Sequence, residues 1–99
     1  MTLKEETVVK VLKFIVPIVI EPDEEKFYAY SPALSGLMVD GDTREEALQN
    51  ARDGATALLH SMVKDGDPIP LSIMSKGTVP PVSVKRNQSY SQEEIRVNI

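Results

Sequence analysis

The side chains that could do chemistry in this chain are mostly carboxylates. The sequence has 15 acidic residues, one histidine and no cysteine. Without cysteine there can be no disulfide, no thiolate metal site and no cysteine nucleophile, and one histidine cannot build a multi-histidine metal site. The candidates that remain for acid–base or metal chemistry are pairs of carboxylates and His60.

Asp40 and Asp42 are the pair of carboxylates that could share a divalent ion or act as an acid and a base. Both flank Gly41 directly before the start of a predicted helix. Aspartate is favoured there as a turn former and beside the positive end of the helix dipole. The spaced ligands of a calcium-binding loop are absent. We therefore expect a structural role for the pair, and no metal, cofactor or catalytic site.

His60 is the obvious candidate for a general base, but no nucleophile pattern accompanies it. It falls on the predicted helix, beside the apolar stripe and away from its centre. The five glycines are too scattered to form a phosphate-binding loop. We expect His60 to lie in solvent or at the boundary of the core, and the protein not to be an enzyme.

The charge of the chain is unevenly distributed around a net value of −4. Residues 21–67 carry eleven acidic and four basic side chains, whereas residues 68–99 carry two acidic and four basic ones. An acidic surface repels phosphate backbones, so direct nucleic-acid binding is disfavoured and a basic protein partner is favoured. Tyr28 and Tyr30 lie close to acidic residues, which suits packing in a core or a protein interface better than stacking on bases.

Length and composition indicate one folded domain over residues 1–99. The chain is 41% hydrophobic and 26% charged, the mixture typical of a globular protein. The longest apolar stretch, residues 14–20, is far shorter than the roughly 20 residues of a membrane-spanning helix. The first residues are acidic, where a secretion signal would be basic. We expect a cytoplasmic protein with no membrane segment.

Three strands are predicted in the first part of the chain. β-Branched residues favour a long strand over residues 7–20, in which Pro17 marks a bend, a bulge or an outward-facing position on a sheet edge. A polar turn at 21–26 leads into an aromatic strand at 27–31, and the two should form an antiparallel hairpin. After turn formers at 32–36, a third short strand is expected at 37–39.

One long helix should follow. Thr43 and Glu46 have the spacing of a capping box, and Gly66 and Pro68 mark the end of the helix after about 20 residues. Apolar residues recur every three or four positions and should cover the sheet; these are Ala47, Leu48, Ala51, Ala55, Leu58, Leu59, Met62 and Val63.

The remainder of the chain is expected to be a loop followed by a C-terminal strand or hairpin. Residues 69–81 show no clean period, residues 82–85 alternate like a half-exposed strand, residues 87–90 are turn-like, and residues 94–99 alternate again. The predicted fold is α+β with two layers: a three-stranded antiparallel sheet, one long helix and a returning strand, in the order βββαβ. Residues 7–70 hold the core pattern, and 71–99 the loop and final strand or hairpin.

Taken together, residues 27–70 resemble the HicB-type antitoxin domain. That family has an aromatic strand ending in Pro-x-Leu-x-Gly, a Gly-Asp-Thr-x-Glu-Glu-Ala helix start, an Asn-Ala pair on the first helical turns and an Ile-Pro pair after the helix. The matching positions here are Pro32, Leu34, Gly36, Gly41, Asp42, Thr43, Glu45, Glu46, Ala47, Asn50, Ala51, Ile69 and Pro70.

The resemblance implies the same two-layer fold, frequent assembly into homo-oligomers and a protein partner. HicB-type proteins neutralise a small basic mRNA-cleaving toxin of the HicA type by covering its active site, and many also bind operator DNA through an appended module. Since no amphipathic helical pattern follows residue 70, we expect no such module here. The leading hypothesis is a non-enzymatic antitoxin-like protein that contacts its partner through Asp23, Glu24, Tyr28 and Tyr30.

Two alternatives remain. The first is a structural or regulatory homo-oligomer without a toxin, in which edge strands at 82–85 or 95–99 pair between chains. The second, ranked last, is an enzyme that uses Asp40, Asp42 and a metal to cut nucleic acid.

Overall fold

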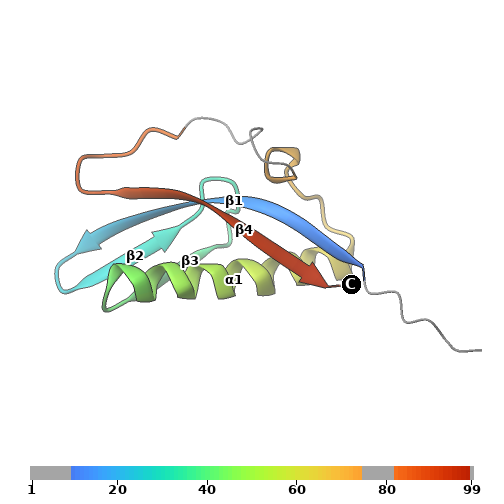
Figure 1. Cartoon of the computed structure of the whole chain (residues 1–99), viewed down its shortest axis with the longest axis horizontal. Helices are drawn as coiled ribbons and strands as arrows, with labels where there is room; N and C mark the ends of the chain where they lie inside the picture. The colour runs from blue at the N-terminus through green and yellow to red at the C-terminus, as the bar shows by residue number, and fades with distance from the viewer. Residues whose placement is uncertain (1–9, 75–81, 99) are drawn as a thin grey trace, which may run out of the picture.

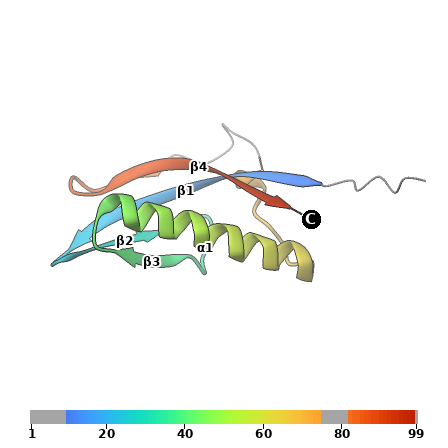
Figure 2. The same ribbon diagram turned by 60° about the horizontal axis from the view of Figure 1, so that its bottom comes forward.

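Four strands and one long helix build the molecule, which is seen in a computed structural model that describes residues 10–74 and 82–98 (Figure 1). The elements are β1 (Val11–Asp23), β2 (Lys26–Tyr30), β3 (Met38–Gly41), α1 (Arg44–Asp65), the short 3-10 helix η1 (Leu71–Ile73) and β4 (Ser89–Asn98). The strands form one antiparallel sheet in the order β3-β2-β1-β4. Helix α1 packs on one face of it (Figure 2). The predicted two-layer α+β fold with the order βββαβ is confirmed, except that the sheet has four strands, because the returning strand β4 joins the predicted three beside β1.

Strand β1 is the long axis of the sheet. It pairs with β4 over residues 11–20 and with β2 over residues 19–23. Because side chains alternate along a strand, Phe14, Val16 and Ile18 all point toward α1 and are fully buried there. The apolar run that predicted the strand therefore supplies the central part of the core.

Pro17 is accommodated at a local edge of the sheet. The pairing between β1 and β4 runs through Pro17, opposite Gln92, without an extra residue, so the strand has no bulge there. The pairing with β2 begins only at Val19. At Pro17 the strand consequently has a neighbour on one side only, and a sheet edge is where a missing N–H donor is tolerated.

Helix α1 begins and ends where its capping residues predict. The hydroxyl of Thr43 accepts a hydrogen bond from the N–H of Glu46 at 3.0 Å, and Gly66 ends the helix with a left-handed φ of 72°. The residues of the predicted stripe that are fully buried are Ala47, Ala51, Ala55 and Leu59. Three of these four are alanines, so the backbone of α1 can lie close to the sheet.

Gly41 lies where β3 runs into α1. A Cβ atom built on it would be 2.4 Å from the backbone nitrogen of Ala47, far inside van der Waals contact. The side chain of Asn50 donates a hydrogen bond to the backbone oxygen of Asp40 at 2.8 Å, which holds the first turns of α1 against the strand. The Gly-Asp-Thr and Asn-Ala motifs thus meet at one tight junction.

The Pro-x-Leu-x-Gly segment is a structural connection between β2 and β3. The hydroxyl of Ser31 accepts hydrogen bonds from the N–H groups of Ala33 and Leu34. This turn sends Leu34 and Leu37 into the core, where both are buried. The motif therefore forms a loop whose apolar side chains pack into the core.

The C-terminal prediction was partly wrong. Residues 82–85 pair with no strand in the described parts of the chain, although their alternation had predicted a strand. Alternation over so few residues has little effect without a neighbouring strand to pair with. Strand β4 instead begins at Ser89, within the segment predicted as a turn, because it finds ten residues of β1 to pair with. Residues 7–9, 75–81 and 99 of the predicted strands and loop lie outside the described residues.

Across residues 10–74 and 82–98, no helix combines the length and the apolar character that crossing a bilayer requires.

The junction at Gly41 makes a prediction about stability. Gly41→Ala should lower the free energy of unfolding by about 2–3 kcal/mol, because the new methyl group meets backbone atoms that cannot move aside. Urea denaturation measures this change. Gly36→Ala is the matched control, since its Cβ would lie 3.6 Å from Leu58 in ordinary contact, and should change the free energy by less than about 0.5 kcal/mol. Equal effects of both substitutions would contradict this view of the junction.

Candidate functional site

The four residues predicted to bind a partner lie along one hairpin. Asp23 and Glu24 are exposed at the turn between β1 and β2. Tyr28 and Tyr30 follow on β2 and are half-buried. Because Ala29 between them points into the core against α1, both tyrosines point to the opposite face of the sheet. The turn and the outer face of the sheet are therefore adjacent surfaces.

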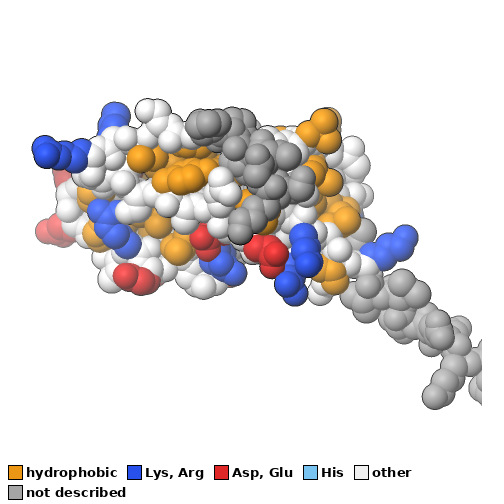
Figure 3. All heavy atoms as spheres, turned by 45° about the horizontal axis from the view of Figure 1, so that its top comes forward, with side chains coloured by type: hydrophobic (Ala, Val, Ile, Leu, Met, Phe, Trp, Pro, Cys, Tyr) orange, Lys and Arg blue, Asp and Glu red, His pale blue; other side chains and the backbone are white. Residues whose placement is uncertain are grey.

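An apolar row crosses this outer face from one edge of the sheet to the other. On β1, Val19 has Tyr90 of β4 on one side and Tyr30 of β2 on the other. Tyr30 in turn lies opposite Met38 of the edge strand β3. Val19 is 1% exposed, whereas Met38 is 69% exposed. Hydrophobic side chains are visible among polar ones on this side of the molecule (Figure 3). The row is therefore buried at Val19 in the middle of the sheet and ends at the sheet edge in the exposed side chain of Met38.

A second row, nearer the hairpin turn, is acidic. Tyr28 lies between Glu21 of β1 and Asp40 of β3. Glu21 accepts a hydrogen bond from the side-chain amide of Gln88 at 2.7 Å, and the carboxylate of Asp40 is 3.7 Å from the ammonium of Lys26. Tyr28 therefore lies between two carboxylates, and the acidic surface of the turn extends through them onto the outer face of the sheet.

Glu24 has an unusual backbone conformation. Its φ of 52° lies in the left-handed region, and among the described residues it is the one non-glycine residue with a positive φ. For a residue with a Cβ atom this conformation costs about 1 kcal/mol or more. Glycine or asparagine would fit the turn better, so glutamate at position 24 lowers the stability of the fold.

The other chemical candidates do not form a site. Asp40 is engaged with Lys26 and, through its backbone oxygen, with Asn50, while Asp42 is exposed beside the helix start. In residues 10–74 and 82–98, no three side chains of the histidine, cysteine, aspartate or glutamate type gather as they would around a metal ion. His60 is exposed on α1, as expected.

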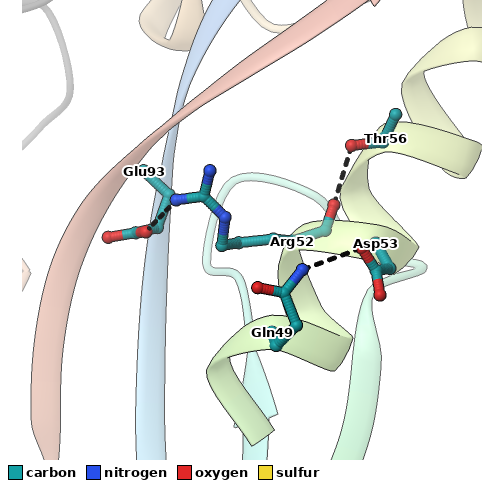
Figure 4. Close-up of polar contacts among 5 residues, drawn as sticks. All are labelled: Gln49, Arg52, Asp53, Thr56 and Glu93. Carbon is teal, nitrogen blue, oxygen red and sulfur yellow. Dashed lines mark hydrogen bonds and ion pairs between the residues drawn. The ribbon is translucent and has the colours of Figure 1, made fainter. Parts of the chain in front are cut away.

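A polar contact network joins α1 to β4 (Figure 4). The guanidinium of Arg52 is 2.6 Å from the carboxylate of Glu93. Near the start of the helix, Arg44 donates to the hydroxyl of Ser89 at 2.5 Å and to the backbone oxygen of Asn87 at 3.3 Å. On the helix itself, Gln49 donates to Asp53 and Thr56 donates to the backbone oxygen of Arg52. The contacts of Arg52 and Arg44 join α1 to the returning strand and to the residues just before it.

Sequence reasoning missed Met38, Tyr90 and Glu21 as members of the surface. Tyr90 fell in a segment predicted as a turn, and nothing in the sequence fixes which residue of β1 it faces. The register between β4 and β1 is what places it in the apolar row. For Met38, the one usable signal was its alternation with the half-buried Val39.

Comparison with known proteins identifies a relative. The chain is 35% identical over 54 residues to the protein called "UPF0150 protein Ta0767" of Thermoplasma acidophilum, and the match covers 54% of this chain and 78% of that protein. No family model matches the chain. No solved structure matches it either.

The strained turn gives a prediction. Glu24→Asn should raise the free energy of unfolding by about 0.5–1 kcal/mol, because asparagine tolerates a left-handed conformation better than glutamate. Thermal or urea denaturation measures the gain. Glu25→Asn removes the same charge from the same turn but not from a left-handed position, and should give no such gain. A gain of equal size at both positions would show that loss of the negative charge, and not relief of the left-handed conformation, raises the free energy of unfolding.

Proposed function

The chain belongs to the UPF0150 family, and on this premise we propose that it is an antitoxin-like protein that acts by binding another protein. UPF0150 is a HicB-like family, which agrees with the motif resemblance of residues 27–70. The proposed partner is a small basic mRNA-cleaving toxin of the HicA type. The protein neutralises it in the cytoplasm by covering its active site, without performing chemistry of its own.

The observation that carries this proposal is the continuity of two surfaces. The acidic turn formed by Asp23 and Glu24 runs directly into the outer sheet face, where Tyr28 and Tyr30 lie with Met38 beside them. Protein interfaces commonly have aromatic and methionine side chains at the centre and charged residues around them. The outer face has this composition, and α1 packs on the opposite face (Figure 2).

Charge complementarity supports a basic partner. An enzyme that cleaves RNA must attract phosphate, so its substrate-binding face is positively charged. Exposed carboxylates at the hairpin turn would attract that face and speed association, while the tyrosines would supply contact area once the two proteins meet. The carboxylate of Glu24 stands at this point although glutamate disfavours its backbone conformation.

The family motifs themselves support the fold more than the function. Gly41, Thr43 and Asn50 form the junction between β3 and α1, and Leu34 packs in the core. Asn50 also lines, with Tyr28 and Met38, a hollow at the β3 edge of the proposed surface. Most motif residues therefore act in folding, and Asn50 lies where it can do both.

The first test uses charge reversal at the turn. The double variant Asp23→Lys with Glu24→Lys should bind the HicA-type toxin encoded beside this gene at least about tenfold more weakly at low salt, mainly through slower association. Surface plasmon resonance with a catalytically inactive toxin measures both rates. Asp65→Lys with Asp67→Lys is the control, with the same change in net charge at the far end of α1, and should bind almost as the wild type does.

The second test addresses the tyrosines. Tyr28→Ala should cost about 2 kcal/mol of binding free energy through faster dissociation, whereas Tyr28→Phe should retain most of the affinity because the ring contact remains. When co-expressed with the active toxin, Tyr28→Phe should restore growth better than Tyr28→Ala does. Wild-type affinity of both the charge-reversed and the Tyr28→Ala proteins, or the lack of any short basic reading frame beside the gene, would overturn the proposal.

A further inference from the structure

A hollow lies at the free edge of β3. This strand ends the sheet order, so β2 pairs with one of its edges and no described strand pairs with the other. It forms the lower margin of the sheet in Figure 2. Five residues line the hollow: Tyr28, Met38, Val39, Asp40 and Asn50. Its volume of about 410 Å³ is enough to admit one long side chain of another protein.

The lining comes from both faces of the sheet. Asp40 lies opposite Tyr28 in the register and Met38 is two residues away, so these side chains belong to the outer face. Val39, between Met38 and Asp40, packs against the core on the other face. Asn50 reaches the strand from α1. A hollow that touches residues of both faces lies at the edge of the strand, and it adjoins the proposed partner surface.

The polar groups of the lining are mainly acceptors. The side-chain amide of Asn50 donates to the backbone oxygen of Asp40 at 2.8 Å. Because a carbonyl oxygen can only accept, this bond fixes the orientation of the amide and leaves its Oδ1 as an acceptor. In residues 10–74 and 82–98, no hydrogen bond reaches that Oδ1. The carboxylate of Asp40 adds two acceptor oxygens, and the ring of Tyr28 has faces of partial negative charge. The lining therefore suits a cation with several N–H donors.

Met38 and Val39 supply the apolar part of the lining. Met38 is 69% exposed, and its unbranched thioether chain can adjust to the shape of a bound group. Long basic side chains pack their aliphatic stems on apolar surface while their charged ends reach polar groups. A side chain of this kind matches both parts of the hollow.

A cation of the chain itself stands beside Asp40 without holding it tightly. The ammonium of Lys26 is 3.7 Å from the carboxylate, which is longer than a hydrogen bond. The two side chains are 53% and 51% exposed, and exposed ion pairs of this kind contribute little to stability. Asp40 thus attracts positive charge, and a cation that fits the hollow better can replace Lys26.

From this lining we propose that the hollow binds an arginine side chain of the protein partner. The guanidinium would contact Asp40 and the Oδ1 of Asn50 and lie against the ring of Tyr28, while Lys26 moves into solvent. Arginine fits better than lysine because its charged group is planar, carries five N–H donors and stacks on aromatic rings. The inference rests on the proposed function, since it supposes a basic protein on the outer face, and it adds the chemistry of one anchoring residue.

A small analogue tests the hollow without the toxin. N-Acetyl-arginine amide should bind the wild-type protein with a Kd on the order of 1–10 mM and shift the NMR signals of residues 38–40 and of the Asn50 side-chain amide. N-Acetyl-lysine amide should give clearly smaller shifts. Asp40→Asn should abolish the response, whereas Asp42→Asn, which removes an exposed carboxylate outside the hollow, should not. Equal shifts from both analogues, or an unchanged response of Asp40→Asn, would overturn the proposal.

Lys26 gives a second measurement with the same analogue. Lys26→Gln should bind N-acetyl-arginine amide about twofold to fivefold more tightly, because Asp40 is freed from a competing cation. In the Asp40→Asn protein the same substitution should change binding little, since no carboxylate remains to be freed. This double-mutant cycle separates the hollow from the general charge of the surface. The same gain in both backgrounds, or no gain in either, would contradict competition at Asp40.

The toxin is then used with a blocked hollow. Met38→Lys should weaken binding of the catalytically inactive toxin at least about tenfold, because the new ammonium occupies the hollow and repels arginine. Leu71→Lys is the matched control, since Leu71 is also an exposed apolar side chain, at 84%, and does not line the hollow. One arginine-to-lysine substitution in the toxin should weaken binding to the wild type but not to Asp40→Asn. Surface plasmon resonance measures these affinities.

The two proposals fail in different ways. If the toxin binds the wild type and Met38→Lys equally well, the arginine site is wrong and the proposed function stands. If N-acetyl-arginine amide binds at the hollow and no toxin binds the protein, the proposed function is wrong and the hollow remains a site for the arginine of another protein.

Discussion

The close approach of α1 to the end of β3 is the constraint on which the rest of the structure depends. Gly41 has no room for a side chain because the backbone of Ala47 lies against it. Small residues continue this approach along the helix: Ala51 and Ala55 are fully buried, and a Cβ atom on Gly54 would be 3.0 Å from Leu37. Helix α1 occupies one face of the sheet only, and on the other face Val19 is buried while Tyr28 and Tyr30 keep part of their surface exposed.

The same constraint explains the relation between motif and function in this family. The motif residues make the turn before the helix, cap its first turn and fix it to β3, and are used for folding. The outer face and the hairpin turn carry few of them. In this chain the motif residues therefore serve the architecture, and the proposed partner surface is formed largely by other residues.

The proposed partner surface uses charge at long range. At the hairpin turn, charge of one sign would attract an oppositely charged partner from a distance.

Several elements could be predicted from the sequence because their signals are local. Thr43 and Gly66 define the ends of α1 through their own capping contacts, and the stripe from Ala47 to Leu59 depends only on helical spacing. The apolar run of β1 likewise belongs to a short segment, whereas the turn predicted at 21–26 is confined to Glu24 and Glu25, because residues 21–23 and Lys26 pair as strands. The fold class and the order of the elements followed from these segments alone, and Asp23, Glu24, Tyr28 and Tyr30 could be placed on one hairpin.

What only the tertiary structure decided is pairing between distant segments. The strand expected at 82–85 did not form, and β4 began earlier than predicted, because a strand extends as far as its neighbour offers backbone groups to pair with. Pairing also placed Tyr90 and Met38 in one row with Tyr30. The sequence by itself determined which segments become helix or strand, through contacts between near neighbours. The surfaces of the protein depend on register, and register is set by the fit of whole strands against one another.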